Sequence, residues 1–208
     1  ARGTPYLGKM IANREFDTVY HEHLCYFSAS SLDTLFTRHN LQIVKIKQVA
    51  VHGGTLRVYV KHGIRTHELP LIRDERVLQL HNFAYYSNFK ERIDQLSQRF
   101  WSTLTAAKLH GKVGAYGAAA KGNTLINYFG VKDVDLKFIA DVSPHKQGKY
   151  SPGAKIPIVA PDLDPGITPY VLLLAWNFRD EIVKQQHDFI ARGGRFIIPI
   201  PEIEIVGQ

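Results

Sequence analysis

The chain has 208 residues, of which 45% are hydrophobic and 22% charged, an ordinary composition for a globular protein. It contains no apolar run of the roughly 18 residues that a membrane-spanning helix needs, and its single cysteine excludes an internal disulfide or a cysteine-based zinc site. Lys and Arg exceed Asp and Glu by 26 to 19, which favours anionic partners, but no basic run marks a nucleic-acid-binding arm. We expect a cytoplasmic protein that binds a phosphate-bearing small molecule, with neither a membrane nor nucleic acid as partner.

Residues 1–63 have the pattern helix, strand, helix, strand, strand. The expected elements are a helix that starts at Pro5, a strand over Phe16–Tyr20, a helix capped by Ser30 or Ser31 that ends near Asn40, and strands over 41–51 and 55–61 joined by Gly53-Gly54. In the first hairpin strand, Ile43, Lys45 and Lys47 are expected on one face and Val44 and Ile46 on the other. Because the chain does not begin with Met and opens directly on a helix, we expect a fragment of a longer protein.

The stretch 73–109 contains neither Gly nor Pro and has helical periodicity. Its apolar positions recur every three or four residues, at Phe89, Ile93, Leu96, Phe100 and Leu104. This stripe predicts one long helix of about 50 Å within a linker at 64–110. We expect the stripe to be a core face without chemistry of its own.

From residue 111 onward, apolar strands alternate with helices. The expected strands cover 112–116, 136–140, 156–158, 170–174 and 195–200, and helices are expected after a glycine-rich turn and over 181–191. This alternation predicts a Rossmann-like parallel sheet with helices on both faces. The fully apolar strand at 170–174 is expected to be central, and the strand at 195–200 to close the order.

The glycine-rich turn over 114–123 follows a strand and opens a helix, where free backbone N–H groups and the helix dipole attract an anion. Gly117, Lys121 and Asn123 are its candidate binding residues. The spacing is neither G-x-G-x-x-G nor a P-loop, which disfavours an NAD-dependent oxidoreductase. The alternative is tight strand–helix packing with Lys121 in solvent.

Further candidates follow later strands, on the ligand side of an open sheet. Asp141 either accepts a ribose hydroxyl or caps the Ser143-Pro144 turn. His145 lies in the basic loop after it. Trp176 and Asn177 come at the end of the apolar strand, where the tryptophan either stacks on a base or closes the core.

A second candidate site lies at 20–23, where two histidines surround a glutamate. On an extended segment, His21 and His23 share a face and Glu22 lies opposite. Only His52 is near enough in sequence to be a third ligand, so we assign no metal. Acid–base chemistry by a histidine is the second interpretation. A purely structural role at a strand end is the third.

A set of segments spread over nearly the whole chain carries a family resemblance. The segments are 16–28 (FDTVYHEHLCYFS), 52–59 (HGGTLRVY), 116–124 (YGAAAKGNT), 143–148 (SPHKQG) and 175–177 (AWN). Together they look like the middle and the C-terminal part of the S-adenosylmethionine-dependent sugar-nucleotide C-methyltransferases. That family has an N-terminal zinc-binding piece, a class I methyltransferase domain and a Rossmann-like C-terminal domain. Its members methylate a carbon next to a keto group of a nucleoside-diphosphate deoxy-sugar.

The resemblance implies a role for each candidate. His23 resembles the general base that takes the proton from the sugar carbon, and Tyr20 and Glu22 resemble neighbours that orient the substrate and stabilise the enolate. The turn at 117–123 is implied to lie near the nucleotide. Residues 1–63 would be the last third of the methyltransferase domain, 64–110 a linker with a long helix, and 111–208 the substrate domain.

The chain also departs from the family. It lacks the zinc-binding cysteines and the acidic-plus-glycine loop that grips S-adenosylmethionine in these enzymes. We therefore expect zinc and S-adenosylmethionine to bind to the parent protein, and the fragment to be inactive alone while it keeps part of the sugar-nucleotide site. The alternative is a non-catalytic Rossmann-like nucleotide-binding or dimerisation module. Apolar faces left by an incomplete first domain would favour a homo-oligomer.

Overall fold

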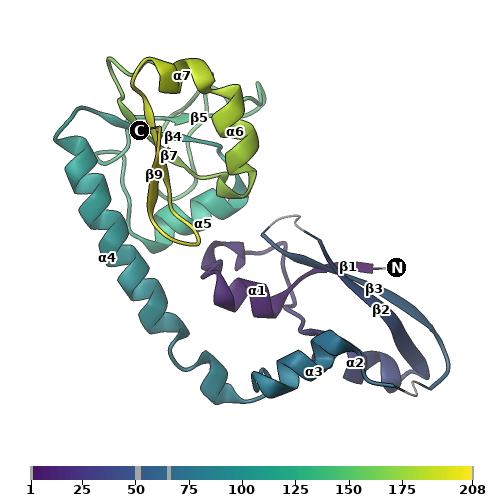
Figure 1. The fold of residues 1–208 in the computed structure, drawn as a ribbon. Coiled ribbons are helices and arrows are strands. Elements are labelled where there is room, and N and C mark those ends of the chain that lie inside the picture. Colours follow the sequence, from purple (N-terminus) through teal and green to yellow (C-terminus); the bar gives the residue numbers. More distant parts are fainter. Residues whose placement is uncertain (1, 50–52, 65–66, 208) are drawn as a thin grey trace. The chain divides into compact units, whose positions relative to one another are not determined.

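The computed structural model describes residues 2–49, 53–64 and 67–207 (Figure 1). They form two compact units. Unit 1 contains Ala1–Glu15 and His21–Arg92, and unit 2 contains Phe16–Tyr20 and Ile93–Gln208. The short segment Phe16–Tyr20 is thus part of unit 2, although the sequence on both sides of it belongs to unit 1.

Unit 1 is a three-stranded antiparallel sheet with helices. Its elements are β1 (Arg2–Pro5), α1 (Leu7–Ala12), α2 (Ala29–Thr37), β2 (Leu41–Val49), β3 (Thr55–His62), α3 (Pro70–Val77) and the 3-10 turn η2 (Phe83–Tyr86). The strand order is β1-β3-β2, and β2 and β3 form the expected hairpin. One core joins the sheet to α2 and α3, with Ile43, Leu56 and Val58 of the strands against Leu32 and Ile72 of the helices.

A β-bulge changes the expected faces of β2. The pairing with β3 shifts between Ile43 and Lys45, so that Val44 is an extra residue on the bulged strand. Ile43 and Ile46 pair with Val60 and Val58, and Ile43 is fully buried, whereas Lys45 is exposed. The expectation that Ile43 shares a face with the two lysines was therefore wrong, because strict alternation ends at the bulge.

Two local expectations for residues 1–63 were also wrong. Phe16–Tyr20 is not a strand, because Phe16–Thr18 forms the 3-10 turn η1. The N-cap of α2 is Ser28, not Ser30 or Ser31. The Ser28 side chain accepts from the Ser31 amide, and the Ser31 hydroxyl accepts from the Ser28 amide, as in a capping box.

A buried carboxylate completes the start of α2. Glu75 of α3 is 1% exposed and accepts from the amides of Ala29 and Ser30, both at 2.7 Å. The hydroxyl of Tyr6 also faces this carboxylate: burial raises the pKa of Tyr6, and the charge of Glu75 and a hydrogen bond to it raise that pKa further. Negative charge at a helix N-terminus is favourable, so Glu75 joins α3 to α2.

The expected single helix over 73–109 is interrupted. The chain forms α3, then η2, and only then α4 (Phe89–Lys108). At 20 residues α4 is about 30 Å long, not 50 Å. The helix propensities of these residues do not predict the break. It falls where Leu80 is buried and Gln79 has a positive φ of 56°. The apolar stripe itself is confirmed as core, because Ile93, Leu96 and Leu104 are nearly inaccessible.

Unit 2 is an α/β sheet of six strands. Its elements are η1, α4, β4 (Val113–Tyr116), α5 (Ala120–Tyr128), β5 (Ile139–Ala140), β6 (Ile158–Val159), β7 (Tyr170–Leu173), the 3-10 turn η3 (Trp176–Phe178), α6 (Arg179–Gln185), α7 (His187–Ala191), β8 (Arg195–Ile198) and β9 (Glu204–Val206). The order is β6-β5-β4-β7-β8-β9. All neighbours are parallel except β8 and β9.

The parallel sheet was correctly expected for five strands, and β7 is central between β4 and β8, buried at all four positions. The sixth strand was missed: β9 adds an antiparallel edge after the cis Ile200–Pro201 bond. The helix expected over 181–191 is split into α6 and α7 at Gln186.

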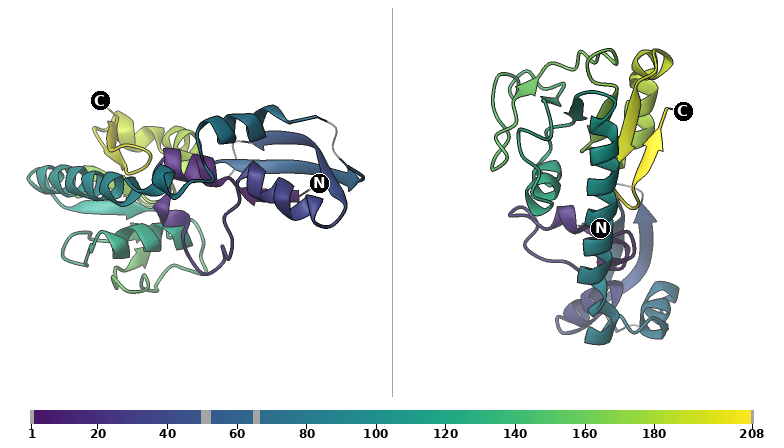
Figure 2. Two further views of the ribbon diagram at one scale, coloured as in Figure 1. Left: turned by 90° about the horizontal axis from the view of Figure 1, so that it is seen from below. Right: turned by 90° about the vertical axis from the view of Figure 1, so that its left-hand side faces the viewer.

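Helices cover both faces of this sheet. The connection from β4 to β5 runs toward one edge of the sheet, and the connection from β7 to β8 runs toward the other edge. Because both crossovers are right-handed, α5 lies on one face of the sheet and α6 and α7 lie on the other. The left view of Figure 2 shows blue-green α5 and yellow-green α6–α7 on opposite sides. Helix α4 lies against the end of α5, since the Trp101 indole donates to the Phe129 carbonyl at 3.0 Å. Within the described residues, no helix is long and apolar enough to cross a membrane.

Candidate functional site

The main candidate site is a cleft at the carboxyl ends of β4, β5 and β7. These strands lie where the order of the sheet reverses, since β4 continues to β5 on one side and has β7 on the other. Open α/β sheets bind ligands at such a switch point. The cleft has a volume of about 490 Å³ and is lined by Tyr116, Gly117, Ala119, Asp141, Val142, Ser143, Lys146, Ala175, Phe178, Glu181, Ile182 and Gln185.

Gly117 forms the floor of the cleft, at the end of β4. Its φ is +92°, a conformation that favours glycine, and a Cβ at this position would lie 2.7 Å from the Cβ of Ala175. The glycine is therefore required by the close approach of the chain that leaves β4 to the chain that leaves β7.

The anion that the glycine-rich turn holds is a side chain of the protein itself. Asp141 is 6% exposed, and its Oδ2 accepts from the Ala118 amide at 2.7 Å. Its Oδ1 accepts from the Ser143 amide at 2.8 Å, so the alternative of a turn cap is the one observed. The Ala118 amide, which the sequence offered to a ligand, is thus already occupied.

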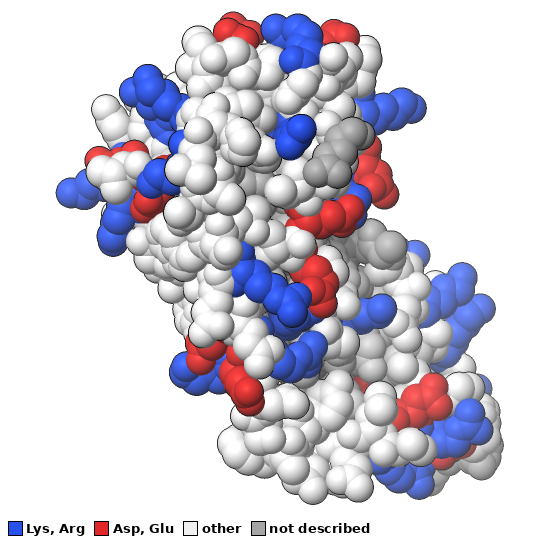
Figure 3. Space-filling view, turned by 60° about the vertical axis from the view of Figure 1, so that its left-hand side comes forward, with Lys and Arg blue, Asp and Glu red and all other residues white. Residues whose placement is uncertain are grey.

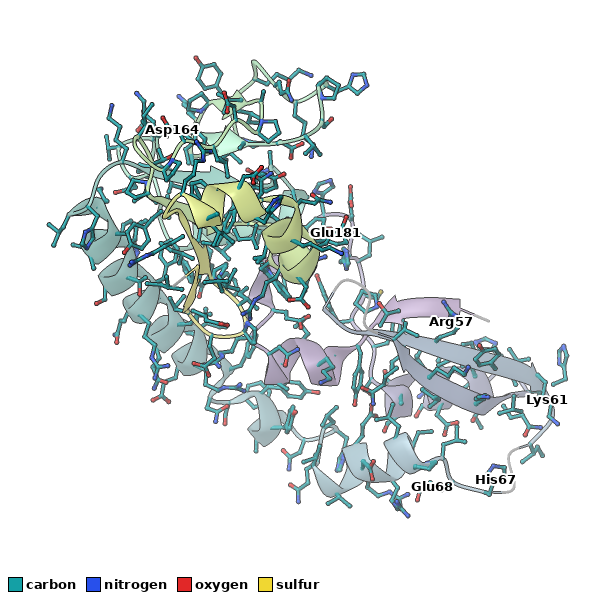
Figure 4. All side chains as sticks on the ribbon, turned by 45° about the horizontal axis from the view of Figure 1, so that its top comes forward. Arg57, Lys61, His67, Glu68, Asp164 and Glu181 are labelled. Atoms are coloured by element: carbon teal, nitrogen blue, oxygen red, sulfur yellow. The ribbon has the colours of Figure 1, made fainter. Side chains whose placement is uncertain are left out.

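Lys146 lies between the turn and the carboxylate. Its Nζ donates to the Ala118 carbonyl at 2.9 Å and lies 3.3 Å from Asp141 Oδ2. Its side chain is 44% exposed and lines the cleft, so it remains accessible to a ligand. Glu181 of α6 also lines the cleft (Figure 4).

Tyr116, at the end of β4, lines the cleft and is buried. Burial raises the pKa of its hydroxyl, a hydrogen bond with Gln186 lowers it, and the charge of Asp141 raises it. The net effect is a raised pKa, so the phenol stays protonated at neutral pH. The cleft therefore combines an apolar wall with a neutral hydroxyl, one lysine and carboxylates.

Lys121 and Trp176, two of the predicted ligand residues, contact each other. The Nζ of Lys121 lies 3.8 Å from the centre of the indole ring. Trp176 is 7% exposed, and its Nε1 donates to Oδ2 of Asp17 at 2.7 Å. Neither Lys121 nor Trp176 lines the cleft, although the neighbouring Ala175 does.

The segment Phe16–Tyr20 is docked on this array. The ring of Phe16 lies 4.9 Å from that of Tyr128 and 5.1 Å from that of Phe129, at the end of α5. Phe16, Asp17 and Thr18 are buried, whereas Val19 is half exposed. Tyr20, a predicted catalytic residue, therefore comes directly after an anchored turn.

The remaining predicted residues lie outside the cleft. His23 is partly buried and its ring stacks on Tyr26 with centroids 6.4 Å apart, whereas Glu22 is exposed. Asn123 and Asn177 are partly buried, and His145 is exposed. His52, the third residue weighed for a metal, lies outside the described residues. In the described part of the chain, no three His, Cys, Asp or Glu side chains gather to hold a metal ion.

Sequence reasoning assigned no role to two residues that organise the site. Lys146 follows His145 in the basic loop, and its sequence position does not reveal its contact with the turn. Asp17 lies next to the histidine-containing motif, but nothing in the local sequence indicates its contact with Trp176.

On each unit, the face in Figure 3 shows basic residues interspersed with acidic ones.

Comparison with known proteins supports the resemblance. The sequence model of the C-methyltransferase C-terminal domain matches residues 50–201. A relative, C-methyltransferase NovU from Streptomyces niveus, is 36% identical over 209 residues, which cover 97% of this chain and 50% of the relative. The chain thus spans about half the length of that relative. With nearly three quarters of its residues matched by the family, the chain belongs to the C-methyltransferase C-terminal domain family.

Proposed function

We propose that the chain is the C-terminal part of an S-adenosylmethionine-dependent C-methyltransferase that acts on a nucleoside-diphosphate keto-deoxy-sugar. Family membership and the name of the relative support the methyltransferase class. In this proposal, residues 1–63 end the methyltransferase domain and 111–208 form the substrate domain. The described residues offer no loop that resembles the family's donor-binding loop, so we assign the methyl donor and zinc to other parts of the parent protein.

The proposed chemistry uses the acidity of a carbon next to a ketone. His23 removes a proton from that carbon, and the electron pair of the C–H bond moves into an enolate. Tyr20 and Glu22 orient the sugar and stabilise the developing negative charge on the enolate oxygen. S-adenosylmethionine supplies an electrophilic methyl group on sulfur. The residues of this chain therefore supply the base and the substrate geometry.

The nucleotide part of the substrate is assigned to the cleft of unit 2. Lys146 is a cation that reaches the cleft, and it keeps donor capacity because an ammonium has three N–H groups. Gly117 lets a ligand approach the backbone at the switch point. The walls at Phe178 and Ile182 offer apolar surface to a base or a deoxy-sugar.

One observation favours an enzyme over the alternative, a non-catalytic nucleotide-binding or dimerisation module. Unit 2 holds both the cleft and the segment that leads into the 20–23 motif, through Phe16 and Asp17. A module that only binds a nucleotide or forms a dimer does not need a buried carboxylate to anchor the loop that precedes two histidines. A substrate domain needs such an anchor, because it must align the segment that carries the reacting residues.

The proposal is tested by His23→Ala in the parent protein. Methyl transfer to the keto-sugar nucleotide should be abolished, while S-adenosylmethionine still binds, because the base acts only on the sugar. His21→Ala is the matched control. Retained turnover in the His23 variant would remove the base assignment.

Binding by the chain itself is tested by calorimetry with thymidine diphosphate. A folded sample should bind it through the cleft, and Lys146→Ala should weaken this binding. No heat of binding at millimolar nucleotide would overturn the assignment of the nucleotide to the cleft.

A further inference from the structure

Two neighbouring side chains anchor the segment Phe16–Tyr20 to different parts of unit 2. Phe16 packs between two rings at the end of α5, and Asp17 reaches the indole of Trp176 in η3. The buried stretch ends at Thr18, and the next residue, Val19, is half exposed. The anchor is thus short and lies immediately before Tyr20.

The bond between Asp17 and Trp176 joins two buried groups that are 159 residues apart in sequence. Asp17 is fully buried, and a buried carboxylate is costly unless polar groups satisfy it. An indole N–H at 2.7 Å from a carboxylate oxygen is a short, charge-assisted hydrogen bond. An apolar side chain would be enough if this position only had to fill space in the core. A carboxylate that bonds the Trp176 indole also fixes the position of the segment relative to that side chain.

Trp176 also connects this anchor to the cleft. Its ring face carries the ammonium of Lys121, the second residue of α5, at 3.8 Å. The residue before it, Ala175, lines the cleft and lies against Gly117. One indole therefore relates the start of α5, the end of β7 and the η1 turn.

The backbone after Asp17 transmits this position to Tyr20. The Val19 amide donates to the Phe16 carbonyl at 3.0 Å, and the Tyr20 amide donates to the Thr18 carbonyl at 3.1 Å. We propose that Asp17 and Trp176 are a positioning pair that holds Tyr20 in register with the nucleotide cleft of the same unit. This inference rests on the function proposed above. Neither residue of the pair is assigned a contact with the reacting atoms.

The test uses Trp176→Phe, which removes the indole N–H and keeps an aromatic face for Lys121. Tyr170→Phe is the matched control, because it removes the hydrogen bond of another buried aromatic side chain of unit 2, which Arg195 donates to the Tyr170 hydroxyl at 2.9 Å. Amide hydrogen exchange of Phe16–Tyr20 is expected to accelerate at least about tenfold in Trp176→Phe and to stay unchanged in the control.

Kinetics in the parent protein separate positioning from mere stability. In Trp176→Phe we expect kcat to fall about tenfold or more while KM for the sugar nucleotide changes less than about twofold. Asp17→Asn keeps an acceptor for the indole and should recover most of the activity that Asp17→Ala loses.

Each outcome decides a separate point. Unchanged exchange in Trp176→Phe would show that the pair does not order the segment, and faster exchange with normal kcat would show that the order is not used in the reaction. If the wild-type parent methylates no keto-sugar nucleotide, the proposed function fails and the positioning role fails with it. The exchange measurement would still report whether the anchor exists.

Discussion

Asp141→Asn would test whether the glycine-rich turn is held by an internal carboxylate. The amide has one accepting oxygen where the carboxylate has two, so either the Ala118 or the Ser143 amide loses its acceptor. An unsatisfied buried N–H costs about 1–3 kcal/mol, and the bond that remains loses about 1 kcal/mol when its acceptor becomes neutral. The Lys146 contact adds nothing to this sum, because that side chain is too exposed for a strong ion pair. We expect unit 2 to lose about 2–4 kcal/mol of unfolding free energy.

Urea unfolding followed by tryptophan fluorescence measures this loss in unit 2 alone, since both tryptophans of the chain, Trp101 and Trp176, belong to that unit. The control is Asp164→Asn (Figure 4), because Asp164 makes the same type of turn contact, with the Gly166 amide at 2.9 Å, on an exposed loop. That variant should lose less than about 1 kcal/mol. An Asp141 variant no less stable than the Asp164 variant would refute the reasoning.

Two further predictions concern the cleft floor and the core of unit 1. Gly117→Ala should lower the free energy of unfolding by about 2–4 kcal/mol and weaken thymidine diphosphate binding in calorimetry, because both φ and the contact with Ala175 oppose a Cβ. Gly130 has a positive φ but open space around it, so Gly130→Ala should cost about 1 kcal/mol. Equal losses in the two variants would contradict the steric argument. Burial and Glu75 raise the pKa of Tyr6 above its ordinary value of 10.0, so the folded state keeps this proton longer than the unfolded state. The contribution of Tyr6 to the free energy of unfolding is therefore complete below pH 10. It falls as pH rises beyond 10, by up to about 1.4 kcal/mol per pH unit. In urea titrations at high pH, Tyr6→Phe should show a shallower decline, and an unchanged slope would exclude Tyr6 as a source.

The parts of the fold that were predicted depend on short-range periodicity. The stripe on α4 and the apolar strand β7 were recognised because burial there follows from spacing within one element. The exceptions are single-residue events. The extra residue at Val44 reverses the faces of β2, and the choice of Ser28 over Ser30 as N-cap depends on where Glu75 approaches.

The candidate site was predicted less completely, because its decisive contacts are distant in sequence. The turn at 114–123 was correctly expected to follow a strand and open a helix, but the carboxylate that occupies it comes 23 residues later. Asp17 and Trp176 both lie in recognised motifs, yet no local pattern relates them across 159 residues. The roles of Tyr20, Glu22 and His23 stay predictions.

The docking of Phe16–Tyr20 makes unit 2 discontinuous in sequence, and this has a consequence for biosynthesis. At about 5–20 residues per second, the ribosome makes Trp176 on the order of ten seconds after Asp17. Until both α5 and Trp176 have been made, the segment lacks its complete docking surface, while the strands of unit 1 can already pair. Unit 2 therefore cannot be obtained by truncation to 93–208, since that piece would expose the rings of α5 that Phe16 covers. The shortest contiguous piece that contains all of unit 2 begins at Phe16 and carries His21–Arg92 of unit 1 without β1 and α1.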